Sequence, residues 1–273
     1  MIACCAYWRK TKLNSPFEHP VLGLCSVDAF MGGLVQLAQP LNGYRAGVDP
    51  VLLAASVPAK AGETVLELGC GGGVASLCLG RRVAGLSLTG IELQADYADL
   101  ARENAARNGI VFTVYAADLN ALPAKVKAQR FDHVIANPPY YDRARSVPSA
   151  NQQREMGLGG DTPLRKWVSV ASKRLAPKGQ LHFVQRADRL PELISAIHTS
   201  LGSIELQPLY ARTGRDAHLV LVRAKKEGRA DFRLHAPIVM HQGAEHGGND
   251  KNYNEIIEAV LRHGAELRFG NSA

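Results

Sequence analysis

Short apolar runs alternate with longer segments of helical period through the middle of the chain. The segments at 74–82 and 94–108 have the spacing of amphipathic helices, and Asn108-Gly109 is a common helix-ending signal. Four apolar runs flank these helices and are predicted to be strands: residues 64–68, 87–92, 111–116 and 131–136. Because strands that alternate with helices usually form a parallel sheet, the pattern predicts an α/β fold.

The second half of the chain continues this alternation and then changes. We expect helices over 162–175, 187–201 and 253–263, with strands over 180–185 and 232–240. Alternating apolar runs at 203–212 and 218–224 are joined by Thr213-Gly214-Arg215-Asp216, which predicts a β-hairpin.

The first part of the chain has a weaker pattern. Residues 1–27 lack periodicity, and we expect a poorly ordered extension without a secretory signal. The alternation at 34–39 predicts a strand, and Asp49-Pro50 predicts a helix that aspartate caps and proline opens. The expected divisions are an N-terminal cap and helix over 28–60, a core over 61–228, and a C-terminal strand and helix elaboration over 229–273.

A glycine-rich turn follows the first strand of the core. Its sequence is Glu67-Leu68-Gly69-Cys70-Gly71-Gly72-Gly73, and such glycines let the backbone approach a ligand closely. A dinucleotide fingerprint would need a third glycine at position 74 or 76, where Val74 and Ser76 stand. The acidic-x-Gly-x-Gly-x-Gly pattern instead resembles the first motif of the class I S-adenosylmethionine-dependent methyltransferases.

Polar residues stand at the ends of the following strands. Glu92 can accept hydrogen bonds from both ribose hydroxyls of a nucleoside, and Asp118 can accept one from an exocyclic adenine amine. The carboxyl ends of parallel strands share one rim of the sheet, so these groups are expected to meet there.

The fourth strand is followed by Asn137-Pro138-Pro139-Tyr140. This tetrapeptide resembles the catalytic motif of methyltransferases that modify conjugated nitrogens: adenine N6, cytosine N4, guanine N2 and the glutamine amide. Asn137 Oδ1 and the Pro138 carbonyl can each accept one N–H, which frees the nitrogen lone pair, and Tyr140 can stack on the target ring. Consecutive prolines hold these acceptors rigidly. Considered alone, the tetrapeptide could equally be a proline turn that closes a strand.

Three motifs together restrict the resemblance to one family of methyltransferases. Asp-Ala-Phe-x-Gly-Gly at 28–33, Gly-Tyr-Arg-Ala-Gly-Val-Asp at 43–49 and Asn-Pro-Pro-Tyr-Tyr at 137–141 resemble the family of tRNA1(Val) adenine-N6-methyltransferases. Those enzymes modify the adenine beside the anticodon, and the resemblance covers about residues 28–265. It implies a Rossmann-like class I methyltransferase fold, with a mixed seven-stranded sheet, an antiparallel last strand and a small N-terminal cap.

The resemblance also implies a cofactor and a set of site residues. The cofactor is S-adenosylmethionine, and the catalytic residues are Asn137, Pro138, Pro139 and Tyr140. The residues expected around the cofactor are Tyr44, Arg45, Asp49, Glu67, Gly69, Gly71, Gly73, Glu92, Leu93, Asp118, Leu119 and Asn137.

The charge of the chain agrees with a nucleic-acid substrate. A net charge of +7 favours a polyanionic partner, here tRNA, although a basic soluble surface is the plainer explanation. The long polar loop at 142–160 and the basic hairpin are expected to bind RNA, unless their charges are merely solvated. The candidate substrate-binding residues are Tyr140, Tyr141, Arg143, Arg145, Arg215, Arg223, Lys225 and Lys226.

Cysteines and histidines give no sign of a metal or a disulfide framework. The five cysteines include no C-x-x-C pair, which indicates a reducing cytoplasm, and His235, His241 and His246 lack the spacing of a metal site. No apolar run reaches transmembrane length. No stable protein partner is implied.

Three other functions remain open from the sequence. N5-glutamine methylation of a release factor uses the same tetrapeptide, but enzymes of that group carry a helical domain for which residues 1–63 are too short. Guanine-N2 methylation of rRNA is a second alternative. A non-catalytic RNA-binding protein with this fold is a third, although it predicts loss of the motif side chains that are present here.

Overall fold

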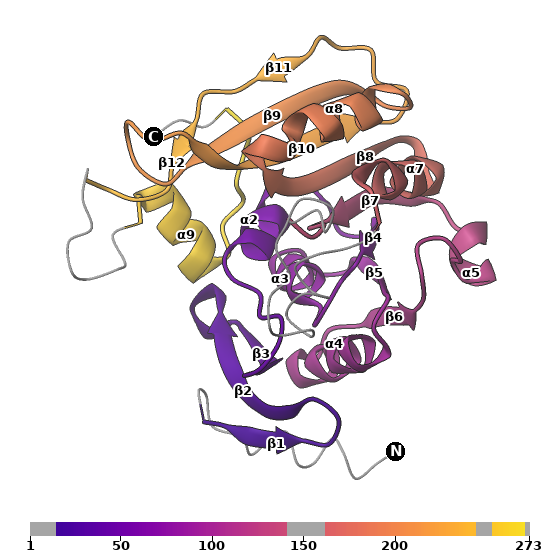
Figure 1. The fold of residues 1–273 in the computed structure, drawn as a ribbon, viewed down its shortest axis with the longest axis vertical. Helices are drawn as coiled ribbons and strands as arrows, with labels where there is room; N and C mark the ends of the chain where they lie inside the picture. Colours follow the sequence, from indigo (N-terminus) through magenta and orange to yellow (C-terminus); the bar gives the residue numbers. More distant parts are fainter. Residues whose placement is uncertain (1–14, 141–161, 244–252, 271–273) are drawn as a thin grey trace.

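The computed structural model describes residues 15–140, 162–243 and 253–270. These residues form a large mixed sheet with helices on both faces and a small antiparallel sheet at the N-terminus (Figure 1). In the described ranges no helix is long and apolar enough to cross a membrane.

The large sheet has the order β11-β9-β10-β8-β7-β4-β5-β6, with β12 also paired to β9. The strands from β6 to β8 are parallel, and β10 runs antiparallel to both β8 and β9. This confirms the Rossmann-like fold with an antiparallel last strand. The bounds are β4 Thr64–Leu68, β5 Ser87–Glu92, β6 Phe112–Ala116, β7 Phe131–Ala136, β8 Leu175–Arg186, β9 Gly202–Tyr210, β10 Ala217–Lys225, β11 Arg233–Leu234 and β12 Ile238–Val239.

In the described part of the chain the large sheet has nine strands, because two short strands extend the expected seven. The segment at 232–240, expected to be one strand, forms β11 and β12 on either side of Pro237. Proline has no N–H to donate to a ladder, which accounts for the interruption. Both pieces pair in parallel with β9.

Alternation along the strands produces one core on each face of the sheet. Val65 and Ile135 belong to one core, while Leu66 and Val134 belong to the other. The first face is covered by α2 Asp49–Ser56, α3 Val74–Arg82, α4 Ala95–Asn108 and α9 Glu255–His263. The second face is covered by α5 Ala124–Ala128, α7 Leu164–Arg174 and α8 Leu190–His198. The region at 187–201, expected to be one helix, divides into η2 Ala187–Arg189 and α8.

The N-terminal sheet consists of β1 Phe17–His19, β2 Gly23–Phe30 and β3 Val35–Pro40, with η1 Met31–Gly33 between the last two. The prediction of a poorly ordered extension is therefore wrong for residues 17–27, and residues 1–14 lie outside the described ranges. Phe17, Cys25 and Val27 bury their side chains with Tyr97 and Leu100 of α4, a distant partner that the local pattern does not reveal.

Helix α4 lies beside β3 of the N-terminal sheet (Figure 1), and two asparagines of the helix bond to that strand. Asn104 Oδ1 accepts from Ala38 N at 2.8 Å, and Asn108 Oδ1 accepts from Gln36 N at 2.9 Å. These bonds satisfy the exposed edge of β3. The end of β3 thereby lies beside the cavity described below, which Ala38, Gln39 and Pro40 help to line.

Candidate active site

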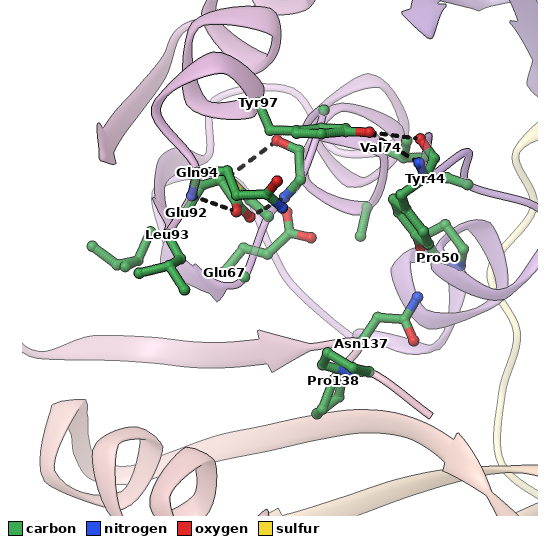
Figure 2. A pocket seen from close by; sticks show the side chains of 18 of the residues that line it. Tyr44, Pro50, Glu67, Val74, Glu92, Leu93, Gln94, Tyr97, Asn137 and Pro138 are labelled. Atoms are coloured by element: carbon green, nitrogen blue, oxygen red, sulfur yellow. Dashed lines mark hydrogen bonds between the residues drawn. The ribbon is translucent and has the colours of Figure 1, made fainter. Parts of the chain in front are cut away.

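A cavity of about 1280 Å³ lies at the carboxyl rim of the parallel strands. Figure 2 shows Asn137 and Pro138 across this space from Glu92 and Tyr97. Most of the residues predicted for the cofactor and the chemistry line it: Tyr44, Arg45, Asp49, Glu67, Gly69, Gly71, Glu92, Leu93, Asp118, Leu119, Asn137, Pro138, Pro139 and Tyr140. Gly73 does not line the cavity. It precedes α3 with a φ of 87°.

The glycine turn forms the floor of the cavity. Gly69 has a φ of 64°, and a Cβ there would lie 2.5 Å from the Trp167 ring. Gly71 has a φ of 51°, and its N–H donates to Glu92 Oε2 at 2.8 Å. The turn is therefore tied to the end of the next strand, and its backbone remains open to the cavity.

Glu92 is a buried acceptor at the end of β5. Its Oε1 accepts from Gln94 N at 2.9 Å, while Oε2 accepts from Gly71 N. Burial raises the pKa of Glu92, and the N–H donors of Gln94 and Gly71 oppose that rise. Each oxygen of a carboxylate can accept a further bond, so a ribose diol fits this position.

Glu67 is more deeply buried, at the end of β4. Its Oε2 accepts from both Ser76 N at 3.0 Å and Ser76 Oγ at 2.5 Å, which fixes the start of α3. Burial raises the pKa of Glu67 to about 8, despite the two bonds from Ser76. A buried carboxyl of this kind becomes easier to ionise when a cation enters the cavity.

Asn137 places an unpaired acceptor beside the same space. Its Oδ1 is buried and has no hydrogen-bond partner among the described residues. An unsatisfied buried acceptor costs about 1–3 kcal/mol, so a fold normally retains one only where a ligand completes it. Pro138 and Pro139 follow in the cavity wall and fix the backbone at this point.

Tyr140 reaches from the same tetrapeptide to the start of α2. Its hydroxyl donates to Asp49 Oδ2 at 2.5 Å. The expected capping role of Asp49 is wrong, because Val48 is the N-cap residue and no side chain caps the helix. Burial raises the pKa of Asp49, opposed by the bond from Tyr140 and by His218. Burial also raises the pKa of Tyr140.

The motif around Tyr44 joins the N-terminal sheet to the cavity. Tyr97 Oη accepts from Tyr44 N at 3.0 Å and donates to Tyr44 O at 3.2 Å. Arg45, expected at the cofactor, instead forms an ion pair with Asp28 at 2.5 Å and donates to Pro40 O at 3.0 Å. Its guanidinium therefore links two of the family-like motifs, while Arg45 still borders the cavity.

Comparison with known proteins identifies the class of the chain. The model of the methyltransferase small domain family matches residues 46–207, which include both the glycine turn and the Asn-Pro-Pro-Tyr motif. The chain belongs to this family. Its cofactor is S-adenosylmethionine, and the cavity residues described above fit that molecule: Glu92 as a diol acceptor and Glu67 as an acid that a sulfonium can ionise.

Relatives of this methyltransferase carry a more specific name. A tRNA1(Val) (adenine(37)-N6)-methyltransferase from Porphyromonas gingivalis is 32% identical over 158 residues, which cover 55% of this chain and 61% of the relative. The chain thus matches about three fifths of that relative's length. A relative of the same name from Glaesserella parasuis is 24% identical and is covered over 93% of its length, against 81% of this chain.

A solved structure agrees with the fold. The crystal structure of a predicted O-methyltransferase from Agrobacterium tumefaciens superposes with a TM-score of 0.64 at 27% identity, over 81% of this chain and 98% of that one.

Two basic residues of this methyltransferase line the cavity although the sequence did not indicate that they belong to the site. Arg165 and Lys166, in the first turn of α7, line the cavity beside Trp167. The sequence predicted a helix over 162–175 but gave no signal that its first turn borders the site. Tyr97 and Gln94 also line the cavity and were missed for the same reason.

Three of the hairpin's basic residues lie at the end of β10 and just beyond it, and two of them have partners within the protein. Arg223 pairs with Glu205 at 3.0 Å and lies over the Phe269 ring, and Lys226 donates to two carbonyl oxygens at the end of α7. Lys225 pairs in register with Gln180, several residues before the carboxyl end of β8. Because β10 runs antiparallel, these three residues lie away from the rim that carries the cavity. Their contribution to RNA binding stays a prediction.

The other predicted substrate-binding residues are either exposed or outside the described part of the chain. Arg215 is exposed in the hairpin turn, which follows the carboxyl end of β9. Tyr141, Arg143 and Arg145 lie outside the described residues. In residues 15–140, 162–243 and 253–270, no group of three metal-ligating side chains is present. His235 there bonds to Glu205 at 2.8 Å.

Proposed function

We propose that this methyltransferase transfers a methyl group from S-adenosylmethionine to the exocyclic N6 of an adenine in tRNA. The observation that carries the proposal is Asn137 Oδ1, a buried acceptor without a partner among the described residues at the edge of the cavity. The names of the relatives support the same target and give adenine 37 of tRNA1(Val) as its position.

The number of hydrogens on the target favours an amine. An exocyclic amine presents two N–H groups, which match Asn137 Oδ1 and the Pro138 carbonyl. A hydroxyl presents one hydrogen and would leave one of these acceptors unpaired. A base would also have to remove that hydrogen before transfer, while the Asp49 carboxylate is already engaged by Tyr140. This distinguishes the proposal from O-methylation, the activity in the name of the Agrobacterium protein.

The residues around the cavity have different roles in the proposed reaction. S-adenosylmethionine supplies an electrophilic methyl group. Asn137 and Pro138 would hold the amine with its lone pair free to attack that methyl group. A C–N bond would then replace the C–S bond, S-adenosylhomocysteine would leave, and the amine would lose its proton to solvent afterwards. Positioning by rigid acceptors therefore supplies most of the rate, and Tyr140 offers a ring against which the base can lie.

The cofactor contacts are part of the same proposal. Glu92 would accept from the ribose, the Gly69 and Gly71 backbone would lie along the methionine portion, and Leu93 would cover the adenine. Leu93 is 65% exposed, which suits an apolar side chain that a ring would cover. Asp118, whose Oδ1 also accepts from Asn120 N at 2.7 Å, borders the same end.

A glutamine side chain also presents two N–H groups, and guanine N2 does so as well. The cationic residues Arg165 and Lys166 at the mouth of the cavity favour a nucleic acid over a peptide. Between bases, the relatives' names favour adenine.

Nucleoside mass spectrometry tests the proposal. The protein is incubated with isotopically labelled S-adenosylmethionine and total RNA from a strain that lacks it. We expect labelled N6-methyladenosine in the tRNA fraction, and none with the Asn137→Ala variant. Labelled N2-methylguanosine, or label in protein, would assign the chain to one of the alternatives. An anticodon stem-loop in which adenine 37 is replaced by guanine would then locate the modified base.

A further inference from the structure

A second depression, of about 440 Å³, lies between α7 and α8 on one face of the sheet. Both helices begin near the carboxyl rim, where Glu192 of α8 accepts from Leu164 N of α7. Figure 1 shows the two helices on the same side of the sheet. The depression follows the seam between them, away from the cavity, and we call it the α7–α8 groove.

The groove is lined by one face of each helix. Arg165, Ser169 and Lys173 of α7 are spaced four residues apart, so they form a single row along the helix. Ser195 and Thr199 line the opposite wall at the same spacing. The cations and the serine hydroxyls of these rows are common donors to phosphate oxygens, whereas the Thr199 hydroxyl already donates to Ala196 O at 2.7 Å.

Arg165 connects the groove to the cavity, because it lines both. It is exposed in the first turn of α7, directly before Lys166 and Trp167 at the mouth of the cavity. A chain that places one unit in the cavity can therefore continue into the groove past Arg165.

The single acid of the groove does not cancel this charge. Glu192 Oε2 pairs with Arg189 at 2.7 Å, and its Oε1 accepts from Leu164 N at 3.3 Å. Its charge is therefore balanced locally, and Arg165 and Lys173 remain to act on a ligand. Neither has an ion pair with an acid among the described residues.

We propose that the α7–α8 groove binds the sugar-phosphate backbone of the substrate RNA next to the target nucleotide. The inference rests on the proposed function, since it deepens the description of the same site. Arg165 and Lys173 are eight residues apart, or about 12 Å along the helix axis at 1.5 Å per residue. That separation exceeds the reach of a single phosphate and suits a linear polyanion that continues from the cavity.

Binding of a fluorescein-labelled single-stranded oligoribonucleotide of mixed sequence tests the groove directly. The full chain and its Arg165→Gln/Lys173→Gln variant are titrated by anisotropy over a series of KCl concentrations. Each lost phosphate contact flattens the slope of log K against log salt by about 0.7 for single strands, so we expect a flattening of up to about 1.4. Lys173→Gln alone changes no residue of the cavity lining, so it should leave the calorimetric affinity for S-adenosylmethionine unchanged.

A matched control removes the same charge elsewhere. Lys60→Gln/Arg262→Gln neutralises two exposed cations that line neither depression. Arg262 belongs to α9, on the opposite face of the sheet. This variant should retain the slope of the unmodified chain. Equal slopes for the two double variants would overturn the proposal.

Methylation assays separate this inference from the proposed function. A groove-dependent slope together with labelled N6-methyladenosine supports both. A groove-dependent slope with a different methylated product leaves the groove in place and overturns the proposed target. If both double variants form N6-methyladenosine in tRNA and have the same KM for tRNA, the proposed target is retained. The proposed role of the α7–α8 groove is then overturned.

Discussion

Tyr140 donates its hydroxyl hydrogen to Asp49 Oδ2 at 2.5 Å, a contact between residues 91 positions apart in the chain. It joins the end of the Asn-Pro-Pro-Tyr motif to the first residue of α2, and both residues line the cavity. The bond has two consequences. It fixes the direction of the Tyr140 ring, and it supplies the buried Asp49 carboxylate with a donor.

Removal of the Tyr140 hydroxyl tests whether the bond to Asp49 positions the ring, because the aromatic surface for stacking is kept. Tyr140→Phe keeps the aromatic face but leaves Asp49 without this donor, and a hydrogen bond to a charged group contributes about 1.5–3 kcal/mol. We expect a lower melting temperature and turnover reduced by about tenfold, with cofactor affinity retained. Differential scanning fluorimetry and single-turnover methylation measure both effects.

Asp49→Asn is the matched control for this bond. Asparagine keeps an oxygen that can accept from Tyr140, so this variant should lose less stability and activity than Tyr140→Phe. Turnover of Tyr140→Phe equal to that of the unmodified chain would show that the hydroxyl does not position the ring. Tyr140→Ala should then still be slower than Tyr140→Phe, because it alone removes the stacking surface.

Glu67 makes the stability of the cofactor-free protein depend on pH. Burial raises its pKa from 4.5 to about 8 in the folded state. A raised carboxyl pKa contributes stability below the unfolded value, and this contribution is lost as pH rises through the folded value. We therefore expect stability to decline between about pH 4.5 and 8, as measured by urea denaturation in the absence of cofactor.

Glu67→Gln tests this assignment, because glutamine stays neutral and can still accept from Ser76 N. The decline in stability over that pH range should be smaller in the variant. Curves of equal slope for the two proteins would assign the pH dependence to other groups.

We expect the Glu92 carboxylate to increase the affinity of the protein for its cofactor. Glu92→Ala removes a carboxylate that accepts from Gly71 N and Gln94 N and is proposed to accept from the ribose. Charge-assisted hydrogen bonds of this kind contribute about 1.5–3 kcal/mol, so affinity for S-adenosylmethionine should fall by roughly tenfold or more. Isothermal calorimetry checks this, and an unchanged affinity would place the ribose elsewhere.

A steric change at Gly69 gives an independent test of the glycine turn. Gly69→Ala would place a methyl 2.5 Å from the Trp167 ring and at a φ of 64°, so both stability and cofactor affinity should decrease relative to the unmodified chain. Gly33→Ala is the matched control, since Gly33 also has a positive φ, of 97°, but a methyl added there would meet no atom within 4 Å. A loss of affinity confined to Gly69→Ala would show that the effect arises at the glycine turn and not from a positive φ alone.

Local patterns predicted the elements that build the rim, because both the strands and the turns carry their own signals. The strands at 64–68, 87–92 and 131–136 and the helix at 74–82 appear with the predicted bounds. Strands buried on both faces are almost wholly apolar, and the glycines that follow the first of them supply the positive φ angles of the turn. Many of the residues proposed for the site from the sequence accordingly line one cavity of the folded chain.

Features that depend on distant partners were not accessible in this way. The burial of Phe17 depends on α4, and the partner of Asp49 is Tyr140, so neither can be read from neighbouring residues. The hairpin cations illustrate the same limit. Their clustering in sequence is real, but the antiparallel direction of β10 and the pairing of Arg223 with Glu205 are properties of the folded sheet.

A substitution of Asn137 should change the rate of methyl transfer without changing the stability of the fold. Its Oδ1 has no hydrogen-bond partner among the described residues, so Asn137→Ala removes no protein contact of that oxygen. We expect the melting temperature and the affinity for S-adenosylmethionine to change little. Turnover should fall by about a hundredfold or more, as for the loss of a transition-state hydrogen-bond partner. The expected pattern is therefore a large change in kcat at nearly constant stability and cofactor affinity. If the variant instead unfolds at a much lower temperature, the asparagine is a structural residue; if it methylates tRNA at the normal rate, the amine must be held by other acceptors.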